Sequence, residues 1–280
     1  MNPEEECGMK RWTMAAAVVG VVALPLNVEA QWVRSDEGWC DDSWGNRDQD
    51  RECFVLEADF PAERALRVDG GRNGGISIEG WERDVIAVRA KVWANASSLD
   101  RARALADDVR VRLDDGRLEA DGPNTGRREH WGVSWEVMVP RSIALDLETH
   151  NGGIDIADVR GDIRFDALNG GVDLRRVGGD VVGHTTNGGL HIELDGSRWS
   201  GEGLDVETTN GGVTLIVPDA YSARLETGTV NGGIDIDFPI TVQGRIGRRL
   251  STTLGEGGPT IRATTTNGGV EIRRGGRAIR

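Results

Sequence analysis

Apolar and polar residues alternate with a period of two after each of seven Asn-Gly-Gly tripeptides. The third and fifth residues after the Asn are apolar in every copy, and the residue between them is polar. This alternation predicts a short strand with one buried face. The tripeptides begin at Asn73, Asn151, Asn169, Asn187, Asn210, Asn231 and Asn267.

From the second tripeptide on, the strand that enters each copy alternates as well. The sixth, fourth and second residues before the Asn are apolar or small, whereas the third and fifth are mostly charged or His. Successive copies from Asn151 start 18, 18, 23, 21 and 36 residues apart, a repeat typical of stacked coils. We therefore expect an all-β, single-domain parallel β-solenoid, β-helix-like, with about 18–23 residues per coil.

Each tripeptide is expected to be a structural corner between the two strands of a coil. The Asn falls in the same alternation as the inward residues before it, so its side chain is expected inside the corner. There the Asn amides of successive coils would stack on one another. Gly-Gly is expected to supply a positive φ at the bend. A calcium-binding repeat is the alternative, and it is disfavoured because four of the seven copies lack the following Asp.

Two local patterns precede the regular coils. Ser97 and Asp100 fit a capping box, and apolar residues recur at helical spacing as far as about Asp108. Two alternating segments, residues 109–113 and 117–120, flank a turn and predict a hairpin. We expect the short helix to cover the end of the solenoid core near its N-terminal end.

The start of the chain is typical of an export signal, which we assign to residues 1–30. Lys10 and Arg11 precede an apolar run from Met14 to Leu26, and Ala30 provides a small residue for cleavage. The mature protein is expected in the periplasm or outside the cell, with no membrane span. The net charge of −13 and the lack of a basic block argue against nucleic acid as a partner.

Two cysteines, Cys40 and Cys53, remain after the export signal, an even number in an oxidising compartment. We expect them to form one disulfide in a Trp-rich segment, residues 31–53. Residues 54–140 are expected to hold the N-terminal part of the solenoid with the helix and hairpin. Residues 141–280 hold the regular coils.

The order of these motifs resembles a known family. Val-Pro followed by Leu-x-Leu-x-Thr-x-Asn-Gly-Gly (Val139 to Gly153), the repeated Thr-x-Asn-Gly-Gly units and the closing Leu-Gly-Glu-Gly-Gly (Leu254 to Gly258) are similar to the bacterial putative-adhesin β-solenoid family. That family is a domain of unknown function in envelope and secreted proteins. The resemblance covers about residues 54–273 and implies a right-handed, β-helix-like fold with no established activity.

Candidate chemistry is sparse. The four histidines form no metal-binding motif, so no metal or cofactor is expected. Asp155 and Asp173 occupy equivalent positions on adjacent coils, where mutual repulsion would raise one carboxyl pKa and an acid–base pair could act on a glycosidic bond. A solvated acidic row relieved by Arg175 or Arg164 is the simpler interpretation.

Nine tryptophans stand against four phenylalanines and one tyrosine. Trp131 and Trp135 share a face of one predicted strand, and Trp199 lies in a coil enlarged by five residues. Each could be a binding platform for a sugar or a partner surface, or a large plug that fills the core.

These observations favour an exported, non-enzymatic β-solenoid that acts as an adhesin or as an envelope-associated binding protein. Its expected partner is a cell-surface glycan or an envelope protein. The first alternative is a carbohydrate-active β-helix enzyme, a polysaccharide lyase or hydrolase that uses outer-face carboxylates. The second is a partner in envelope-stress signalling.

Overall fold

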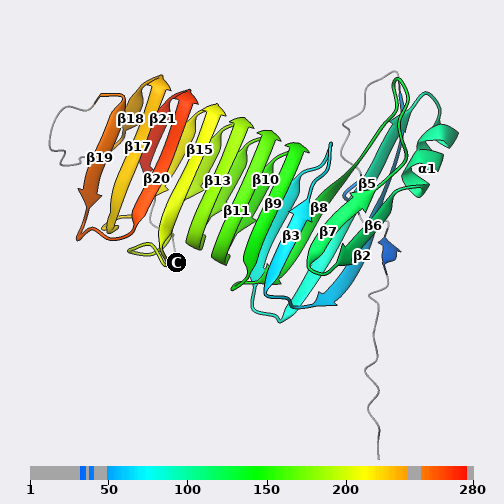
Figure 1. Cartoon of the computed structure of the whole chain (residues 1–280), viewed down its shortest axis with the longest axis horizontal. Helices are drawn as coiled ribbons and strands as arrows, with labels where there is room; N and C mark the ends of the chain where they lie inside the picture. Colours follow the sequence, from blue (N-terminus) through cyan, green and yellow to red (C-terminus); the bar gives the residue numbers. More distant parts are fainter. Residues whose placement is uncertain (1–31, 36–37, 41–48, 239–246, 276–280) are drawn as a thin grey trace, which may run out of the picture.

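The computed structural model describes residues 32–35, 38–40, 49–238 and 247–275. Its strands form two sheets that face each other along the length of the molecule (Figure 1). Sheet A consists, in spatial order, of β1 (Val33–Ser35), β2 (Asp50–Pro61), β5 (Val85–Ala96), β8 (His130–Pro140), β4 (Ile76–Trp81), β10 (Ile154–Ala157), β12 (Val172–Arg175), β14 (Leu190–Glu193), β16 (Val213–Val217), β21 (Val270–Arg274) and β18 (Ile234–Ile236). Sheet B consists of β19 (Arg249–Leu254), β17 (Ala223–Asn231), β20 (Thr260–Asn267), β15 (Gly203–Asn210), β13 (Gly178–Asn187), β11 (Arg160–Asn169), β9 (Ala144–Asn151), β3 (Ala65–Asp69), β7 (Arg117–Asp121) and β6 (Arg110–Asp114).

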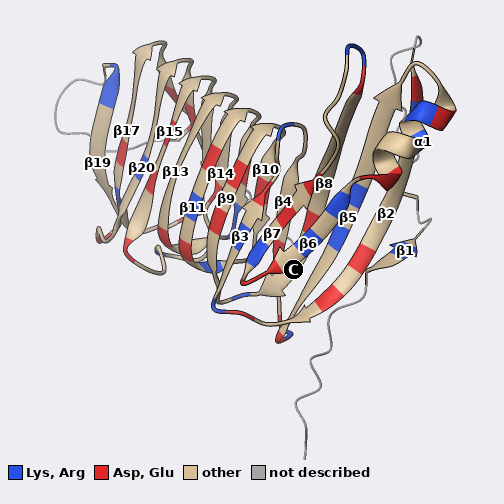
Figure 2. Ribbon diagram, turned by 45° about the vertical axis from the view of Figure 1, so that its right-hand side comes forward, with Lys and Arg blue, Asp and Glu red and all other residues tan. Residues whose placement is uncertain are grey.

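Each regular coil places one strand in sheet B and the next in sheet A. Neighbouring coils pair in parallel, with Asn169 opposite Asn151 on one side and Asn187 on the other. The inward residues of both strands, such as Leu147 and Ile154, are buried in one continuous core. Acidic and basic residues occupy outward positions, so charge of both signs is interspersed along the strands (Figure 2). The predicted all-β parallel β-solenoid is confirmed.

The seven Asn side chains form one hydrogen-bonded ladder along the corners. Each link joins an Nδ2 to the Oδ1 of the neighbouring Asn at 2.8–3.1 Å. The ladder lies on the outside, since Asn73 is partly buried and the other six side chains are exposed. The predicted inward placement of the Asn side chains is therefore wrong.

Threonine takes the place inside the corner instead. The Thr two residues before the Asn is buried, and its hydroxyl donates to a glycine carbonyl of the adjacent coil at 2.6–2.8 Å. This bond satisfies a carbonyl that would otherwise be buried without a partner at the bend. Five corners share the arrangement, through Thr149, Thr185, Thr208, Thr229 and Thr265.

The glycines are required for close backbone approach rather than for a left-handed bend. All seven tripeptides lie in the described residues, and none of their glycines has a positive φ. The expectation that Gly-Gly supplies a positive φ at the bend is therefore wrong. A Cβ on Gly170 would instead overlap the carbonyl oxygen of Gly152 in the preceding coil. The first glycine of each tripeptide meets such a backbone oxygen, because the coils stack directly on one another at the corner.

The last coil of the chain does not lie at the end of the stack. β20 pairs with β15 on one side and with β17 on the other, and β21 lies likewise between β16 and β18. Asn267 consequently stands between Asn210 and Asn231 in the ladder. β19 then pairs antiparallel with β17 and ends sheet B.

The N-terminal end of the molecule is built differently. β5 runs antiparallel to β2 and β8, and α1 (Leu99–Asp107) packs against β2 and β5 through Ala102, Leu105 and Ala106. The helix begins one residue later than its capping box predicts, because Ser98 accepts the N-cap hydrogen bond from the Arg101 amide. β6 and β7 form the predicted hairpin.

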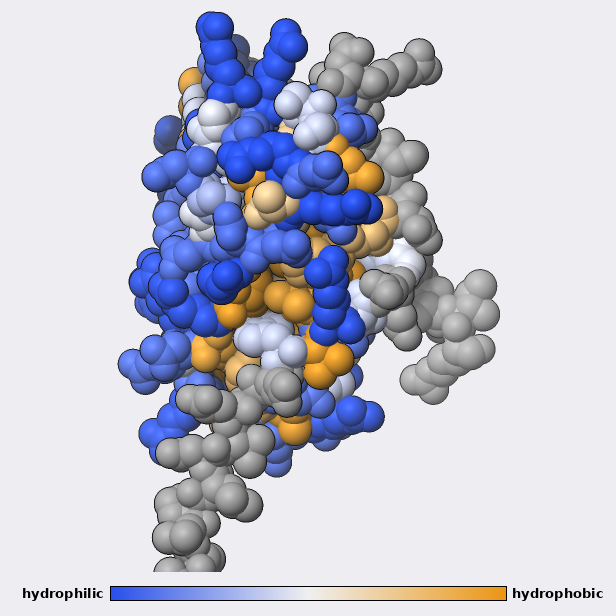
Figure 3. Space-filling view, turned by 90° about the vertical axis from the view of Figure 1, so that its right-hand side faces the viewer, coloured by the Kyte–Doolittle hydropathy of each residue, from blue (hydrophilic) through white to orange (hydrophobic). Residues whose placement is uncertain are grey.

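The segment before residue 54 contributes to the sheet. The disulfide between Cys40 and Cys53 is present, with an S–S distance of 2.01 Å. β1 pairs antiparallel with β2, and β2 begins at Asp50, so the expected boundary at residue 53 falls inside a strand. The end-on view shows apolar residues between charged ones at this end, where Trp32 packs edge-on against Phe60 (Figure 3). The proposed export signal lies outside the described residues.

A candidate binding pocket at the open corner

A pocket of about 560 Å³ lies where the row of tight corners ends. The corner at Asn73 joins β3 to β4, and the next strands toward the N-terminal end are β7 in sheet B and β8 in sheet A. These two strands are connected by residues 122–129 rather than by an Asn-Gly-Gly corner. The two sheets therefore part at this point, and the pocket is lined from both of them.

Trp131 forms the aromatic part of the pocket lining. It stands at the start of β8 with the inward parity of that strand, and it is partly buried against the core. Its indole Nε1 donates to the Pro123 carbonyl at 2.9 Å. A Cβ on Gly122 would run into the indole ring, so the loop backbone packs directly on that ring. These contacts fix the orientation of the indole.

The Asn ladder supplies the polar wall. Asn73 Nδ2 donates to the Trp131 carbonyl at 3.2 Å, which ties the last member of the ladder to β8. Asn151 Nδ2 donates to the Arg72 carbonyl at 2.8 Å as well as to Asn73 Oδ1. The backbone around Arg72 and Asn73 is thus held by the Asn151 side chain and by the hydrogen bond from Asn73 to β8, and the pocket is preformed.

Both carboxylates that line the pocket have partners. Glu129 accepts two hydrogen bonds from Arg101, at 2.8 and 2.9 Å, and one from the Gly126 amide. The hydrogen bonds from Arg101, and then the one from the Gly126 amide, lower the pKa of Glu129 to about 2. Asp69 accepts from the Gly71 amide at 2.8 Å and lies 3.8 Å from Arg117.

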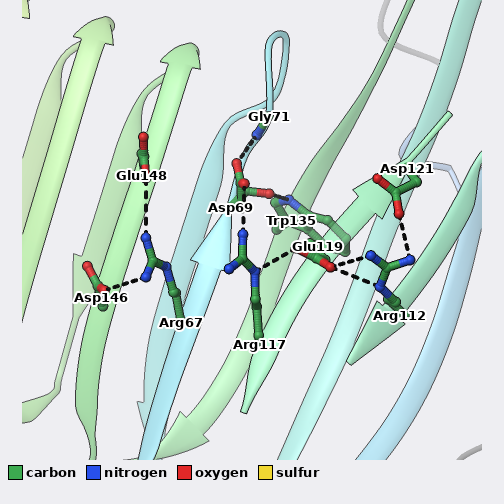
Figure 4. Close-up of polar contacts among 10 residues, drawn as sticks. All are labelled: Arg67, Asp69, Gly71, Arg112, Arg117, Glu119, Asp121, Trp135, Asp146 and Glu148. Atoms are coloured by element: carbon green, nitrogen blue, oxygen red, sulfur yellow. Dashed lines mark hydrogen bonds and ion pairs between the residues drawn. The ribbon is translucent and has the colours of Figure 1, made fainter. Parts of the chain in front are cut away.

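Asp69 belongs to a wider network on the outer face of sheet B (Figure 4). Arg117 lies between Asp69 and Glu119, and Arg112 lies between Glu119 and Asp121. One strand away, Arg67 pairs with Asp146 and Glu148. These side chains form ion pairs with one another across β6, β7, β3 and β9. We therefore assign this surface a role in holding the strands together rather than in binding.

Two of the tryptophans proposed as platforms are core residues. Trp135 is 1% exposed and donates from Nε1 to the Asp69 carbonyl at 3.1 Å. Trp199 is 4% exposed and donates to the Gly179 carbonyl at 2.9 Å. Neither ring is available at the surface, so a platform role for Trp135 or Trp199 is wrong. Only Trp131 of the three lines a pocket.

Asp155 and Asp173 are brought together as expected, but away from the pocket. They face each other across β10 and β12 on the outer face of sheet A, and Asp173 Oδ1 lies 3.7 Å from Arg175 Nε. Partial burial, and then the negative charge of Asp173, raises the pKa of Asp155, while Arg175 opposes the rise. Neither carboxylate is among the residues that line the pocket.

We expect Asp155→Asn to increase stability at neutral pH. A carboxyl whose pKa is raised on folding disfavours the folded state above that pKa, and this penalty disappears as the pH falls below the ordinary Asp value of about 3.9. The gain in free energy of unfolding, measured with urea at pH 7, should therefore shrink in a pH series toward about 4. Asp205→Asn, which removes an exposed carboxylate paired with Arg262, should give no gain.

The sequence did not identify several residues that shape the pocket. Arg72, Glu129 and Arg101 carry no motif, and residues 122–129 could be assigned only to a polar loop. The one residue of the pocket that the sequence did single out was Trp131, at the start of a predicted strand that follows a Gly-containing loop. In the described part of the chain, no group of three or more His, Cys, Asp and Glu side chains could hold a metal ion.

Two parallel sheets joined at repeated corners define the chain as a β-solenoid. Residues 141–273 match the family model described as Toastrack DUF4097. No curated protein matches the chain. No helix in the described ranges is long and apolar enough to cross a membrane.

Solved structures with a similar arrangement include several named as adhesins. A putative cell adhesion protein from Clostridium sporogenes is 12% identical, with 79% of this chain and 100% of that chain covered and a TM-score of 0.41. A putative adhesin from Bacteroides fragilis is also 12% identical, covering 79% and 96%, with a TM-score of 0.38. A putative lipid binding protein from Parabacteroides distasonis is 10% identical, covering 81% and 98%, with a TM-score of 0.33.

Proposed function

We propose that this protein is an exported, non-catalytic binding protein that holds a saccharide of the cell surface or envelope in the pocket at Trp131. The observation that carries the proposal is an aromatic ring held in a fixed orientation beside a polar wall of backbone and amide groups. A sugar presents an apolar C–H face and a rim of hydroxyls, which such a lining complements. Pockets of this size with a few placed polar groups are typical of small-ligand sites.

Export is supported by the disulfide and by the signal-like pattern of residues 1–30. A disulfide between Cys40 and Cys53 fits an oxidising compartment such as the periplasm or the extracellular space. The disulfide joins the N-terminal segment to β2, and Trp39 beside it lies over Arg89 and Lys91 at 5.3 Å from each. The beginning of the folded domain is thereby attached to the sheet.

A binding role is favoured over the enzymatic alternative by the position of the carboxylates. The Asp155–Asp173 pair lies on the outer face of a sheet, and the pocket that could enclose a sugar contains two carboxylates that are each paired with an arginine. A general acid needs a raised pKa, whereas the pKa of Glu129 is lowered. Product analysis after incubation with envelope polysaccharides tests this directly, since any cleavage would contradict a purely binding role.

Trp131→Ala should weaken saccharide binding by at least about tenfold, because truncation of an aromatic anchor in a pocket commonly costs more than 1.4 kcal/mol. A glycan array identifies the ligand, and isothermal titration of the variant measures the loss. Trp81→Ala is the matched control, since Trp81 is partly buried on β4 and does not line the pocket. Equal binding by both variants, with circular dichroism showing that both are folded, would overturn the site.

A further inference from the structure

One charged group that lines the pocket has no partner in the described part of the chain. Four titratable residues contribute to the lining, namely Asp69, Arg72, Glu129 and His130. Both carboxylates are paired, Asp69 with Arg117 and Glu129 with Arg101. Within the described residues, the Arg72 guanidinium has neither an ion-pair nor a hydrogen-bond partner, although it is exposed at the pocket. The pocket therefore presents a guanidinium that no carboxylate of the described residues engages.

Arg72 differs from the arginines on the outer face of sheet B. Arg67, Arg112 and Arg117 each contact two carboxylates (Figure 4). Arg72 lies three residues after the end of β3. Its own carbonyl is held by Asn151, and the next residue, Asn73, is bound to β8. The backbone that carries the free guanidinium is thus fixed relative to the Trp131 ring.

The net charge of −13 does not prevent an anion from binding at this position. At physiological ionic strength the Debye length is about 8 Å, so exposed charges farther away are largely screened. Close to the pocket, Glu148 and Asp166 lie on the other side of Arg72, but neither is within ion-pairing distance of its guanidinium. The guanidinium is therefore free to pair with an anion that enters the pocket. A guanidinium offers a planar pair of donors that matches a carboxylate oxygen pair.

We propose that the pocket selects an anionic sugar residue, with the sugar ring against Trp131 and its acidic group paired with Arg72. A hexuronic acid, whose carboxylate is attached to the ring, combines the two features in one residue. A sulfated sugar carries the same chemistry from another source. This inference rests on the proposed saccharide-binding function and adds the chemical class of the ligand.

The test compares an oligosaccharide of hexuronic acid with its carboxyl-reduced, neutral counterpart, by isothermal titration with the full mature chain. The wild type should bind the acidic form about tenfold more tightly, as expected for a hydrogen bond to a charged group. Arg72→Gln should bind both forms equally, at the affinity of the neutral one. Raising the salt concentration should weaken acidic binding to the wild type and leave Arg72→Gln unchanged.

Arg164→Gln is the matched control, because it removes the same charge from the outer face of β11, outside the pocket. It should retain the preference of the wild type. A sulfated oligosaccharide that binds through Arg72 when the uronate does not would support the anionic site and assign its source. Equal wild-type affinity for all forms, lost in Trp131→Ala, would overturn the inference and leave the proposed function intact. If no saccharide binds, both are overturned.

Discussion

Gly170→Ala should destabilise the protein by about 3 kcal/mol or more, at the upper end of overpacking effects. A Cβ on Gly170 would overlap the carbonyl of Gly152 in the preceding coil, and the nearest atoms are all backbone. Neither coil can move aside, because β9 and β11 are paired in register before the contact and β10 and β12 are paired in register after it. The change should appear as a large fall in the urea midpoint.

Gly171→Ala provides an almost ideal comparison one residue further along. A Cβ on Gly171 would have the Gly189 carbonyl oxygen as its nearest neighbour, at 3.5 Å, an ordinary van der Waals distance. Its φ is not in the left-handed region, so alanine is tolerated and the cost should stay below about 1 kcal/mol. Similar losses for the two variants would show that glycine is needed for flexibility of the corner rather than for close stacking.

Trp199→Ala should destabilise the protein by about 3–5 kcal/mol, the usual cost of removing a buried tryptophan. The side chain is 4% exposed and belongs to the core cluster. Its indole N–H also satisfies the Gly179 carbonyl, which would lose its partner. Chemical unfolding measures the loss, and saccharide binding at the Trp131 pocket should persist in the variant while it remains folded.

Trp199→Phe separates packing from hydrogen bonding at the same position. The phenyl ring fills most of the space but cannot donate to Gly179, so about 1–3 kcal/mol of the loss should remain. If Trp199→Ala unfolds at the same urea concentration as the wild type, the side chain is not a structural part of the coil, and a role at the surface would again have to be considered.

The alternation of side chains predicted the coils because each strand has one buried face over its whole length. It failed at the corner, where the chain passes from sheet B to sheet A. There Thr149 is the last inward residue of β9, and Asn151 already lies outside. A strand pattern carries no information about side-chain direction through a bend, so the parity of the Asn could not be extrapolated.

The pocket depends on which strands become neighbours in the sheets. The alternation of residues along the sequence does not predict those neighbours. β4 is flanked by β8 and β10, although 48 residues separate Trp81 from His130 at the ends of β4 and β8. Trp131 could be recognised as unusual, but Arg72 and Asn151, which line the same pocket, come from distant segments. Likewise, nothing in the local sequence around Trp199 distinguishes a ring that turns into the core from one that faces solvent.

The insertion of the final coil between two earlier ones means that the stack cannot grow by adding one coil after another as the chain emerges. The place between β15 and β17 is filled by residues 260–267, so a long loop has to close before the second sheet edge is complete. This final coil therefore connects the coil of β17 and β18 to the rest of the stack. Assembly of this end is therefore a late, non-local event that depends on residues 260–274.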